Sequence, residues 1–101
     1  MAYTILRTLR ARQDLEEIGH YTLGRWGRRQ MAKYLRQLEM TIQTLAEDPE
    51  ALGQHRGHIK PGLRSLRHEQ YHFVFYRVQD RRVEILRVLH QRRDWATLLK
   101  P

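Results

Sequence analysis

The chain has 101 residues, no cysteine and a formal net charge of +8. This length suits a single domain, residues 1–101, with one core, and the lack of cysteine excludes disulfides and thiolate metal sites. No stretch approaches the roughly 20 apolar residues of a membrane helix, and the N-terminus lacks the apolar run of a signal peptide. We therefore expect a cytoplasmic protein without a membrane partner.

The charge is unevenly distributed. Residues 1–50 hold 8 Lys/Arg and 7 Asp/Glu, a net +1, whereas residues 51–101 hold 11 and 4, a net +7. A basic half attracts nucleic acid, a nucleic-acid-bound enzyme or an acidic protein. Arginine used only for solubility explains the composition equally well, so charge alone leaves the partner, and direct binding of nucleic acid, open.

The N-terminal half predicts a strand and two helices. Tyr3–Thr8 is β-branched and aromatic and indicates a strand, after which Thr8 can cap a helix. Helical spacing then gives one apolar face for each helix: Ala11, Leu15, Ile18, Thr22 and Trp26, then Met31, Leu35, Leu38, Ile42 and Leu45. We expect a tight turn between Gly24 and Gly27, an antiparallel helical hairpin that ends at Asp48-Pro49, and core positions for Tyr21, Trp26 and Tyr34.

The second half predicts a loop and three strands. Leu52–Gly62 is rich in glycine and polar residues and indicates a loop, and Leu63–His68 indicates a strand that turns at Glu69-Gln70. Tyr71–His90 indicates an antiparallel β-hairpin whose turn centres on Asp80 and Arg81. This register pairs Val78 with Val83, Tyr76 with Ile85, Arg77 with Glu84, Val74 with Arg87 and Tyr71 with His90.

Both faces of this hairpin are apolar. One face, with Val74, Tyr76 and Ile85, is expected to pack on the helices. The second face is expected to carry Phe73, Phe75, Leu86 and Val88, joined by Arg64, Leu66 and His68 of the preceding strand. That second face needs a terminal segment or a partner to cover it. Asp94 can cap a short helix, Trp95–Lys100, in which Trp95 either covers this face or contacts a partner.

These elements predict an α+β fold. It consists of an N-terminal strand, an antiparallel helical hairpin, three antiparallel strands in one sheet packed on the helices, and a short C-terminal helix. We expect the N-terminal strand to join this antiparallel sheet beside the hairpin. The sequence contains no internal repeat.

The histidines and glycines give little sign of a cofactor or metal site. Zinc needs three or four convergent ligands, but His68 and His72 flank a turn, and His55 and His58 lie in a loop without nearby carboxylates. No phosphate-binding glycine loop occurs. We therefore expect no metal and no cofactor.

The sharper candidate site is basic. Its members are expected at the ends of the second sheet face and just beyond it: Arg64, Arg77, His90, Arg92 and Arg93, with Tyr71 and Glu84 close by. Such a set can hold a polyanion, and a metal-independent ribonuclease can be built from residues of these types. A plain cross-strand ion pair between Arg77 and Glu84 and a histidine at a strand end explain the same residues.

The order of elements and four segments resemble the ParE-type toxins of the RelE/ParE superfamily. The segments are DLEEIGHYTLGRWG (14–27), YLRQLEMTIQTLAEDP (34–49), HIKPGLRSLRHEQYHFVFYRV (58–78) and VEILRVLHQRRDW (83–95). KPGLRS and ILRVLHQRRD are specific when both occur in this order. The resemblance implies a toxin of a type II toxin–antitoxin system that causes growth arrest by poisoning DNA gyrase and is neutralised by a small ParD-like antitoxin.

The same superfamily contains ribosome-dependent mRNA endoribonucleases of the RelE type, which place a basic residue on the middle strand, where Phe73 stands here. We therefore favour an inhibitor without catalytic residues. In the alternative, the catalytic set is His90, Arg64, Arg93 and Tyr71. The predicted target-binding residues are Arg64, Arg77, His90, Arg92, Arg93 and Trp95, and the predicted antitoxin-binding residues are Phe73, Phe75, Leu86 and Val88.

Overall fold

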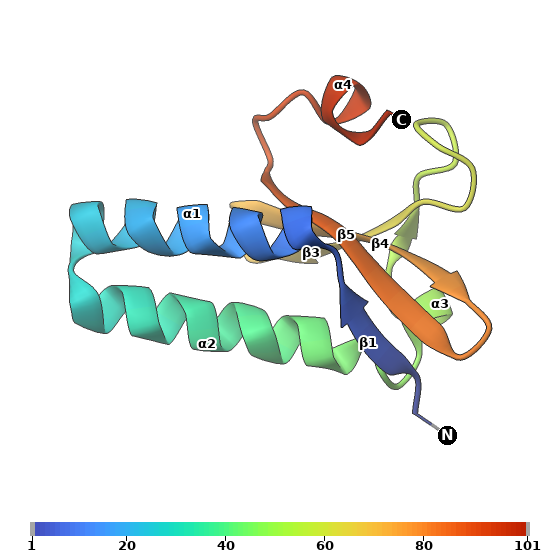
Figure 1. The fold of residues 1–101 in the computed structure, drawn as a ribbon, viewed down its shortest axis with the longest axis horizontal. Helices are drawn as coiled ribbons and strands as arrows, with labels where there is room; N and C mark the ends of the chain where they lie inside the picture. Colours follow the sequence, from blue (N-terminus) through green and yellow to red (C-terminus); the bar gives the residue numbers. More distant parts are fainter. Residues whose placement is uncertain (1, 101) are drawn as a thin grey trace.

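The computed structural model describes residues 2–100 and shows a five-stranded sheet between a long helical hairpin and a short C-terminal helix (Figure 1). The elements are β1 (Thr4–Arg7), α1 (Leu9–Trp26), α2 (Arg28–Thr44), α3 (Pro49–Leu52), β2 (Gln54–His55), β3 (Arg64–His68), β4 (His72–Gln79), β5 (Arg82–His90) and α4 (Trp95–Leu99). The strand order is β1-β5-β4-β3-β2. The predicted α+β class and element order are confirmed, with α3 added just before the expected loop and β2 added within it.

The N-terminal strand lies beside the hairpin as predicted, but its direction differs. β1 runs parallel to β5, with Thr4 opposite Arg82 and Arg7 opposite Ile85, so the sheet is mixed and the expectation of a wholly antiparallel sheet was wrong. The helical hairpin starts at the C-terminal end of β1, and the chain after α2 returns to the N-terminal end of β1. There the Tyr3 amide donates to the Ala46 carbonyl at 2.7 Å. The apolar pattern of a short strand does not indicate whether it runs parallel or antiparallel to its neighbour. The connections between elements decide that direction.

The turn of the helical hairpin is tighter than predicted, and α2 ends at Thr44, before the predicted end at Asp48-Pro49. Thr8 caps α1 as expected, and Gly27 alone, with φ of 90°, joins the two helices, while Gly24 lies within α1. The tip of the hairpin extends beyond the sheet (Figure 1). Tyr21 and Trp26 are consequently 65% and 66% exposed, so their predicted core positions were wrong, whereas Tyr34 is buried as predicted.

The main core lies between the hairpin and one face of the sheet. Val74, Tyr76 and Ile85 are fully buried there, as predicted. Ala11, Ile18, Tyr34, Leu38, Ile42, Leu45, Val83 and Val88 complete this cluster. The two apolar stripes at helical spacing thus meet alternate residues of β4 and β5, which fixes the sheet face that the helices cover.

The turn between β3 and β4 is one residue longer than predicted. His68 lies opposite His72 and Arg64 opposite Tyr76, so three residues form the loop, with Glu69 at φ of 53°. A shift of one residue exchanges the two faces of a strand. Leu66 therefore packs against the helix-side core, and the prediction that Arg64, Leu66 and His68 share a face with Phe73 was wrong.

A β-bulge at Leu86 changes the second half of the β4–β5 hairpin. The predicted pairs Val78–Val83, Tyr76–Ile85 and Arg77–Glu84 are confirmed. Beyond them the register shifts by one residue, so Val74 lies opposite Val88 and His72 opposite His90, and the predicted pairs Val74–Arg87 and Tyr71–His90 were wrong. Val88 consequently lies in the helix-side core, and Leu89 takes its expected place on the second face.

The chain covers its own second sheet face. Leu63, Phe73, Phe75, Leu89 and Leu99 form a smaller core there, with Ile59, Leu86, Trp95 and Leu98 packed against it. The Trp95 ring lies edge-on to Phe73 and Phe75, with ring centroids 4.6 and 5.1 Å apart. Asp94 caps α4 as predicted, since its carboxylate accepts from the Thr97 amide at 3.3 Å. Of the two predicted covers, the terminal segment is the one that the structure contains.

Residues 2–100 contain neither a membrane-spanning helix nor a metal-binding cluster. None of the helices there is long and apolar enough to cross a membrane. The same residues contain no group of three metal-ligating side chains placed to hold an ion.

Candidate functional site

A groove of about 810 Å³ lies between α1 and the end of the sheet where β5 stops. Its walls carry the exposed aromatic residues Tyr21 and Trp26 of α1 and Tyr71 of the β3–β4 loop. Arg25, His90 and Arg93 add basic groups. Exposed tyrosine, tryptophan and arginine side chains around one groove are typical of a protein-binding surface.

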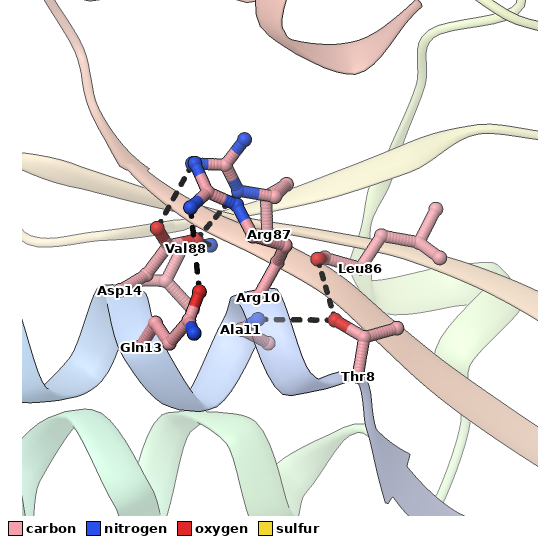
Figure 2. A network of polar contacts seen from close by, with 8 residues as sticks. All are labelled: Thr8, Arg10, Ala11, Gln13, Asp14, Leu86, Arg87 and Val88. Atoms are coloured by element: carbon pink, nitrogen blue, oxygen red, sulfur yellow. Dashed lines mark hydrogen bonds and ion pairs between the residues drawn. The ribbon is translucent and has the colours of Figure 1, made fainter. Parts of the chain in front are cut away.

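The inner end of the groove is fixed by an ion pair between Asp14 of α1 and Arg87 of β5 (Figure 2). The Asp14 carboxylate accepts from Arg87 Nε at 2.8 Å, from Arg87 Nη2 at 2.9 Å and from the Val88 amide at 2.9 Å. Both side chains are buried, and the hydrogen bond from Asp14 raises the pKa of Arg87 above its usual value. Arg87 therefore stays charged, and α1 is held in one position against β5.

The cap of α1 secures the bulge next to this ion pair. Thr8 Oγ1 accepts from the Ala11 amide at 3.0 Å and donates to the Leu86 carbonyl at 2.8 Å, as Figure 2 shows. β1 pairs with β5 only as far as Ile85. Beyond that point, side chains of Thr8 and Asp14 satisfy backbone groups of β5 that would otherwise lack a partner.

A second polar network lies under the groove. The Tyr34 hydroxyl is 2.6 Å from His72 Nδ1. Burial raises the pKa of Tyr34, and burial together with the nearby His90 and His68 rings lowers the pKa of His72 to about 4. Both groups are therefore neutral at pH 7, and the Tyr34 hydroxyl and His72 Nδ1 share one hydrogen bond.

His68 is the buried partner of this network. Its Nδ1 atom is 2.7 Å from Thr41 Oγ1 of α2, and its ring lies edge-on to Tyr34 at a centroid distance of 5.3 Å. Burial lowers the pKa of His68 as well. Two neutral histidines on adjacent strands thus join α2 to the sheet.

Three of the residues predicted for the site come together in the groove: Tyr71, His90 and Arg93. The rings of Tyr71 and His90 have centroids 6.5 Å apart. His90 Nδ1 accepts from the Arg92 amide at 3.1 Å, which places the proton of the neutral ring on Nε2. The Arg92 side chain is exposed beside the groove and does not line it.

The other predicted basic residues lie elsewhere. Arg64 Nη2 donates to the backbone carbonyls of Glu50 and Gly53 at 2.5 and 3.0 Å. It lies four residues along β3 from the row formed by His68, His72 and His90, a separation of about 13 Å at the usual rise of a strand. Arg77 pairs with Glu84 at 2.7 Å near the hairpin turn, as the ion-pair interpretation predicted.

Trp95 and the four residues predicted to contact an antitoxin lie within the fold. Trp95 packs on Phe73 and donates from Nε1 to the His90 carbonyl at 3.2 Å. Phe73, Phe75 and Val88 are 8%, 0% and 2% exposed, and Leu86 is half-buried. Residues of α4 pack on Phe73 and Phe75, and contact between these four residues and an antitoxin stays a prediction.

Sequence reasoning missed the α1 wall of the groove. Tyr21, Arg25 and Trp26 were assigned to packing or to the turn, yet Asp14, Ile18, Tyr21 and Arg25 recur at three- and four-residue spacing, which places them on one stripe of α1. The signal available was this stripe, which is only partly apolar and continues past the last buried position, Thr22.

Comparisons with known proteins agree closely. A family model described as "ParE toxin of type II toxin-antitoxin system, parDE" matches residues 5–95. The chain is 46% identical over 82 residues to Toxin ParE1 of Caulobacter vibrioides, which covers 81% of this chain and 82% of the relative. It is 41% identical over 85 residues to Toxin ParE1 of Mycobacterium tuberculosis, which covers 83% of this chain and 85% of the relative.

Two solved structures share the fold. A chain from the chromosomal ParDE TA system of P. aeruginosa gives a TM-score of 0.78 at 22% identity, covering 88% of this chain and 96% of its own length. A chain from the toxin–antitoxin complex RelBE2 of Mycobacterium tuberculosis gives 0.62 at 26% identity, covering 90% and 100%. The fold of this chain is therefore one that solved structures already contain.

Proposed function

This chain belongs to the ParE family of type II toxins in the RelE/ParE superfamily, and on that premise we propose that it binds DNA gyrase and stalls it on cleaved DNA. One observation favours binding of gyrase over cleavage of RNA. A nuclease needs its catalytic residues around one phosphate, and here the candidate catalytic residues lie apart. Arg64 lies about 13 Å along β3 from the row that contains His90, and its guanidinium is engaged by backbone carbonyls.

The position on the middle strand supports the same choice. A ribonuclease of the RelE type places a basic residue on the middle strand. In this chain that position is Phe73, which is buried beneath Trp95. Loss of one group that stabilises a transition state typically lowers a rate by a factor of about 10² or more. A binder needs only a complementary surface, and the groove offers Tyr21, Trp26 and Arg93 for one.

The proposed gyrase contact includes His90 and Arg93 in the groove and Arg92 beside it. His90 is the last residue of β5, and Arg92 and Arg93 follow it in a segment tied to the sheet by the hydrogen bond from Trp95 Nε1 to the His90 carbonyl. This anchoring limits the entropy that the segment loses when it binds.

A small antitoxin with an acidic, amphipathic segment is the proposed neutralising partner. The net charge of +8 favours an acidic ligand, and the aromatic walls of the groove suit apolar side chains of such a segment. An antitoxin lying in the groove would cover His90 and Arg93 and so compete directly with gyrase. The related RelBE2 structure is named as a toxin–antitoxin complex.

The mechanism is tested by adding the purified chain to two assays. In a gyrase supercoiling assay, the proposal expects loss of supercoiling together with accumulation of cleaved DNA. In the second assay, ribosomes translating a defined mRNA should leave that mRNA intact. Codon-register cuts in the mRNA with gyrase unaffected would establish the RelE-type alternative instead.

The partner is tested by co-expression with the small open reading frame beside its gene. The two products should co-purify, and growth arrest should be relieved. A chain that is harmless when expressed alone and does not bind the neighbouring product would refute the proposed toxin–antitoxin pair.

A further inference from the structure

A second pocket, of about 420 Å³, lies at the opposite side of the sheet, where β2 meets β3. Its polar side chains are Gln54, Arg56, Ser65 and Arg67, and Phe73 forms its apolar floor. Among residues 2–100, no carboxylate side chain lines it. In the described part of the chain, the two guanidinium groups of this pocket therefore have no carboxylate as counter-charge. Such a pocket favours an anionic ligand.

Arg56 is held rigidly in this pocket. Its Nε donates to Ser65 Oγ at 2.9 Å and its Nη2 to Gln54 Oε1 at 3.0 Å. Its guanidinium carbon lies 5.7 Å from the ring centroid of Phe73 and 5.3 Å from that of Trp95. The side chain is therefore in place before any ligand arrives, and it needs little reorganisation to bind one.

Arg67 approaches the same ring from β3. Its guanidinium carbon is 5.7 Å from the Phe73 centroid, and its Nε donates to the Glu69 carbonyl at 2.8 Å. Two distances of 5.7 Å to one centroid limit the separation of the guanidinium carbons to at most 11.4 Å. Within residues 2–100, no side-chain or backbone acceptor is hydrogen-bonded to the two Nη atoms of Arg67, which leaves them for a ligand.

The pocket is open toward the edge of the sheet. β2 pairs with Arg64 and Ser65, and in the described part of the chain no strand pairs with Leu66 to His68 on that side. An extended ligand can therefore pass along this edge and reach both arginines.

We propose that Arg56 and Arg67 bind phosphate groups of a nucleic-acid backbone. The guanidinium fork matches the geometry of a phosphate, and residues 51–101 carry a net charge of +7, which favours a polyanion over a single acidic side chain. Phe73 is covered by the guanidinium groups and by Trp95, so it offers no face on which a base can stack. The contact is therefore to the backbone and independent of base sequence. It goes beyond the proposed gyrase binding, because the chain itself touches nucleic acid.

The test uses fluorescence anisotropy of the full-length chain with a labelled DNA strand of about 20 nucleotides, enough to cross one small domain, and with the corresponding duplex. Arg56→Gln with Arg67→Gln removes both contacts, whereas Arg28→Gln with Arg29→Gln removes the same charge from the exposed start of α2. Each lost phosphate contact lowers affinity by a factor of about 5 at 0.15 M salt, so the pocket variant should bind about 25-fold more weakly than the unaltered chain. Equal losses in the two variants would show diffuse attraction and overturn the proposal.

Arg67→Gln alone provides a second measurement, because Arg67 is exposed while Arg56 supports Trp95. It should lower affinity about fivefold and reduce the slope of log K against log salt by about one, with an unchanged thermal melt. Inorganic phosphate should displace the strand more effectively than chloride at equal ionic strength, and this difference should vanish in the pocket variant. No difference between the two salts, or a strong preference for one base sequence, would refute a backbone phosphate site.

Discussion

The Asp14 carboxylate binds the guanidinium of Arg87 and the amide of Val88 at the same time, at 2.8–2.9 Å. It thereby joins α1 to the bulged half of β5, and the bulge directs the Arg87 side chain to α1. We predict that Asp14→Ala lowers the free energy of unfolding by about 3–5 kcal/mol, because it leaves a buried cation unpaired and a backbone amide without an acceptor. Urea denaturation measures this loss.

A double variant distinguishes charge from packing. Asp14→Leu with Arg87→Met leaves no buried charge and should cost less than Asp14→Ala alone. A double variant as unstable as the single one would mean that the hydrogen bond to the Val88 amide, and not the unpaired charge, dominates.

The same residues show how far the sequence could predict the sheet. Alternation of apolar residues and the Asp80-Arg81 turn were enough to place Val78, Tyr76 and Arg77 opposite their true partners. The pairing beyond Leu86 depends on Thr8 and Asp14, which are more than 70 residues away, so no local pattern could indicate the bulge.

The predicted length of the β3–β4 loop was wrong for a local reason. Glu69 adopts φ of 53° without being glycine or asparagine, the residues that usually signal this backbone conformation. A two-residue turn at Glu69-Gln70 was therefore the natural prediction, and the third loop residue reversed the face of β3.

The sequence predicted the residues of the candidate site that lie near strand ends. It missed those on the part of α1 that extends beyond the sheet. His90 and Arg93 follow directly from the end of β5, and Tyr71 from the neighbouring loop. Tyr21 and Trp26 carry helical spacing like core residues, and only the extension of α1 beyond the sheet exposes them.

The histidine network predicts loss of stability in acid. The folded pKa of His72 is about 4, below its usual 6.5, so its contribution is complete above pH 6.5. As pH falls from 6.5 to 4, His72 binds a proton in the unfolded chain but stays largely neutral in the folded chain. The free energy of unfolding therefore decreases. The decrease is at most about 3 kcal/mol over this window, and we expect about 2 because the ring is only half-buried. Lowering of the His68 pKa acts in the same direction.

Urea denaturation at several pH values between 7.5 and 4.5 measures this effect. His72→Asn keeps an acceptor near the position of Nδ1 for the Tyr34 hydroxyl but does not titrate, so its stability should vary less with pH than that of the unaltered chain. Parallel curves for the two proteins would assign the acid sensitivity to other groups.

Two glycines should respond to alanine in opposite ways. A Cβ atom on Gly53 would lie 1.9 Å from Tyr76 Oη and 3.0 Å from the Ser65 carbonyl, and Tyr76 is fully buried with its hydroxyl bonded to the Pro49 carbonyl. Gly53→Ala should therefore cost at least about 2 kcal/mol. Gly24 lies in α1 with no atom within 4 Å of its Cβ position, so Gly24→Ala should stabilise by about 0.5–1 kcal/mol. Thermal melts of the two variants, with the unaltered chain as reference, give the sign of each change.

The segment after β5 supplies the last prediction, which concerns toxicity. Arg92 and Arg93 are exposed, and among residues 2–100 neither side chain forms an ion pair, so replacing both with alanine should leave the fold and the melting temperature unchanged. An arginine at the centre of a protein interface contributes about 1–2 kcal/mol, a factor of about 5 to 30 in affinity. The double variant should therefore need a correspondingly higher concentration to inhibit gyrase supercoiling, and it should arrest growth less. Arg81→Ala with Arg82→Ala, at the exposed β4–β5 turn outside the groove, is the charge-matched control.

The two single variants separate the groove from its surroundings. Arg93 lines the groove and Arg92 does not, so Arg93→Ala should account for most of the loss. If Arg92→Ala is the more damaging change, the gyrase contact lies on the exposed side of this segment and the groove serves another partner. If the double variant keeps full toxicity and full inhibition, this segment is not the functional surface, although the chain remains a member of its family.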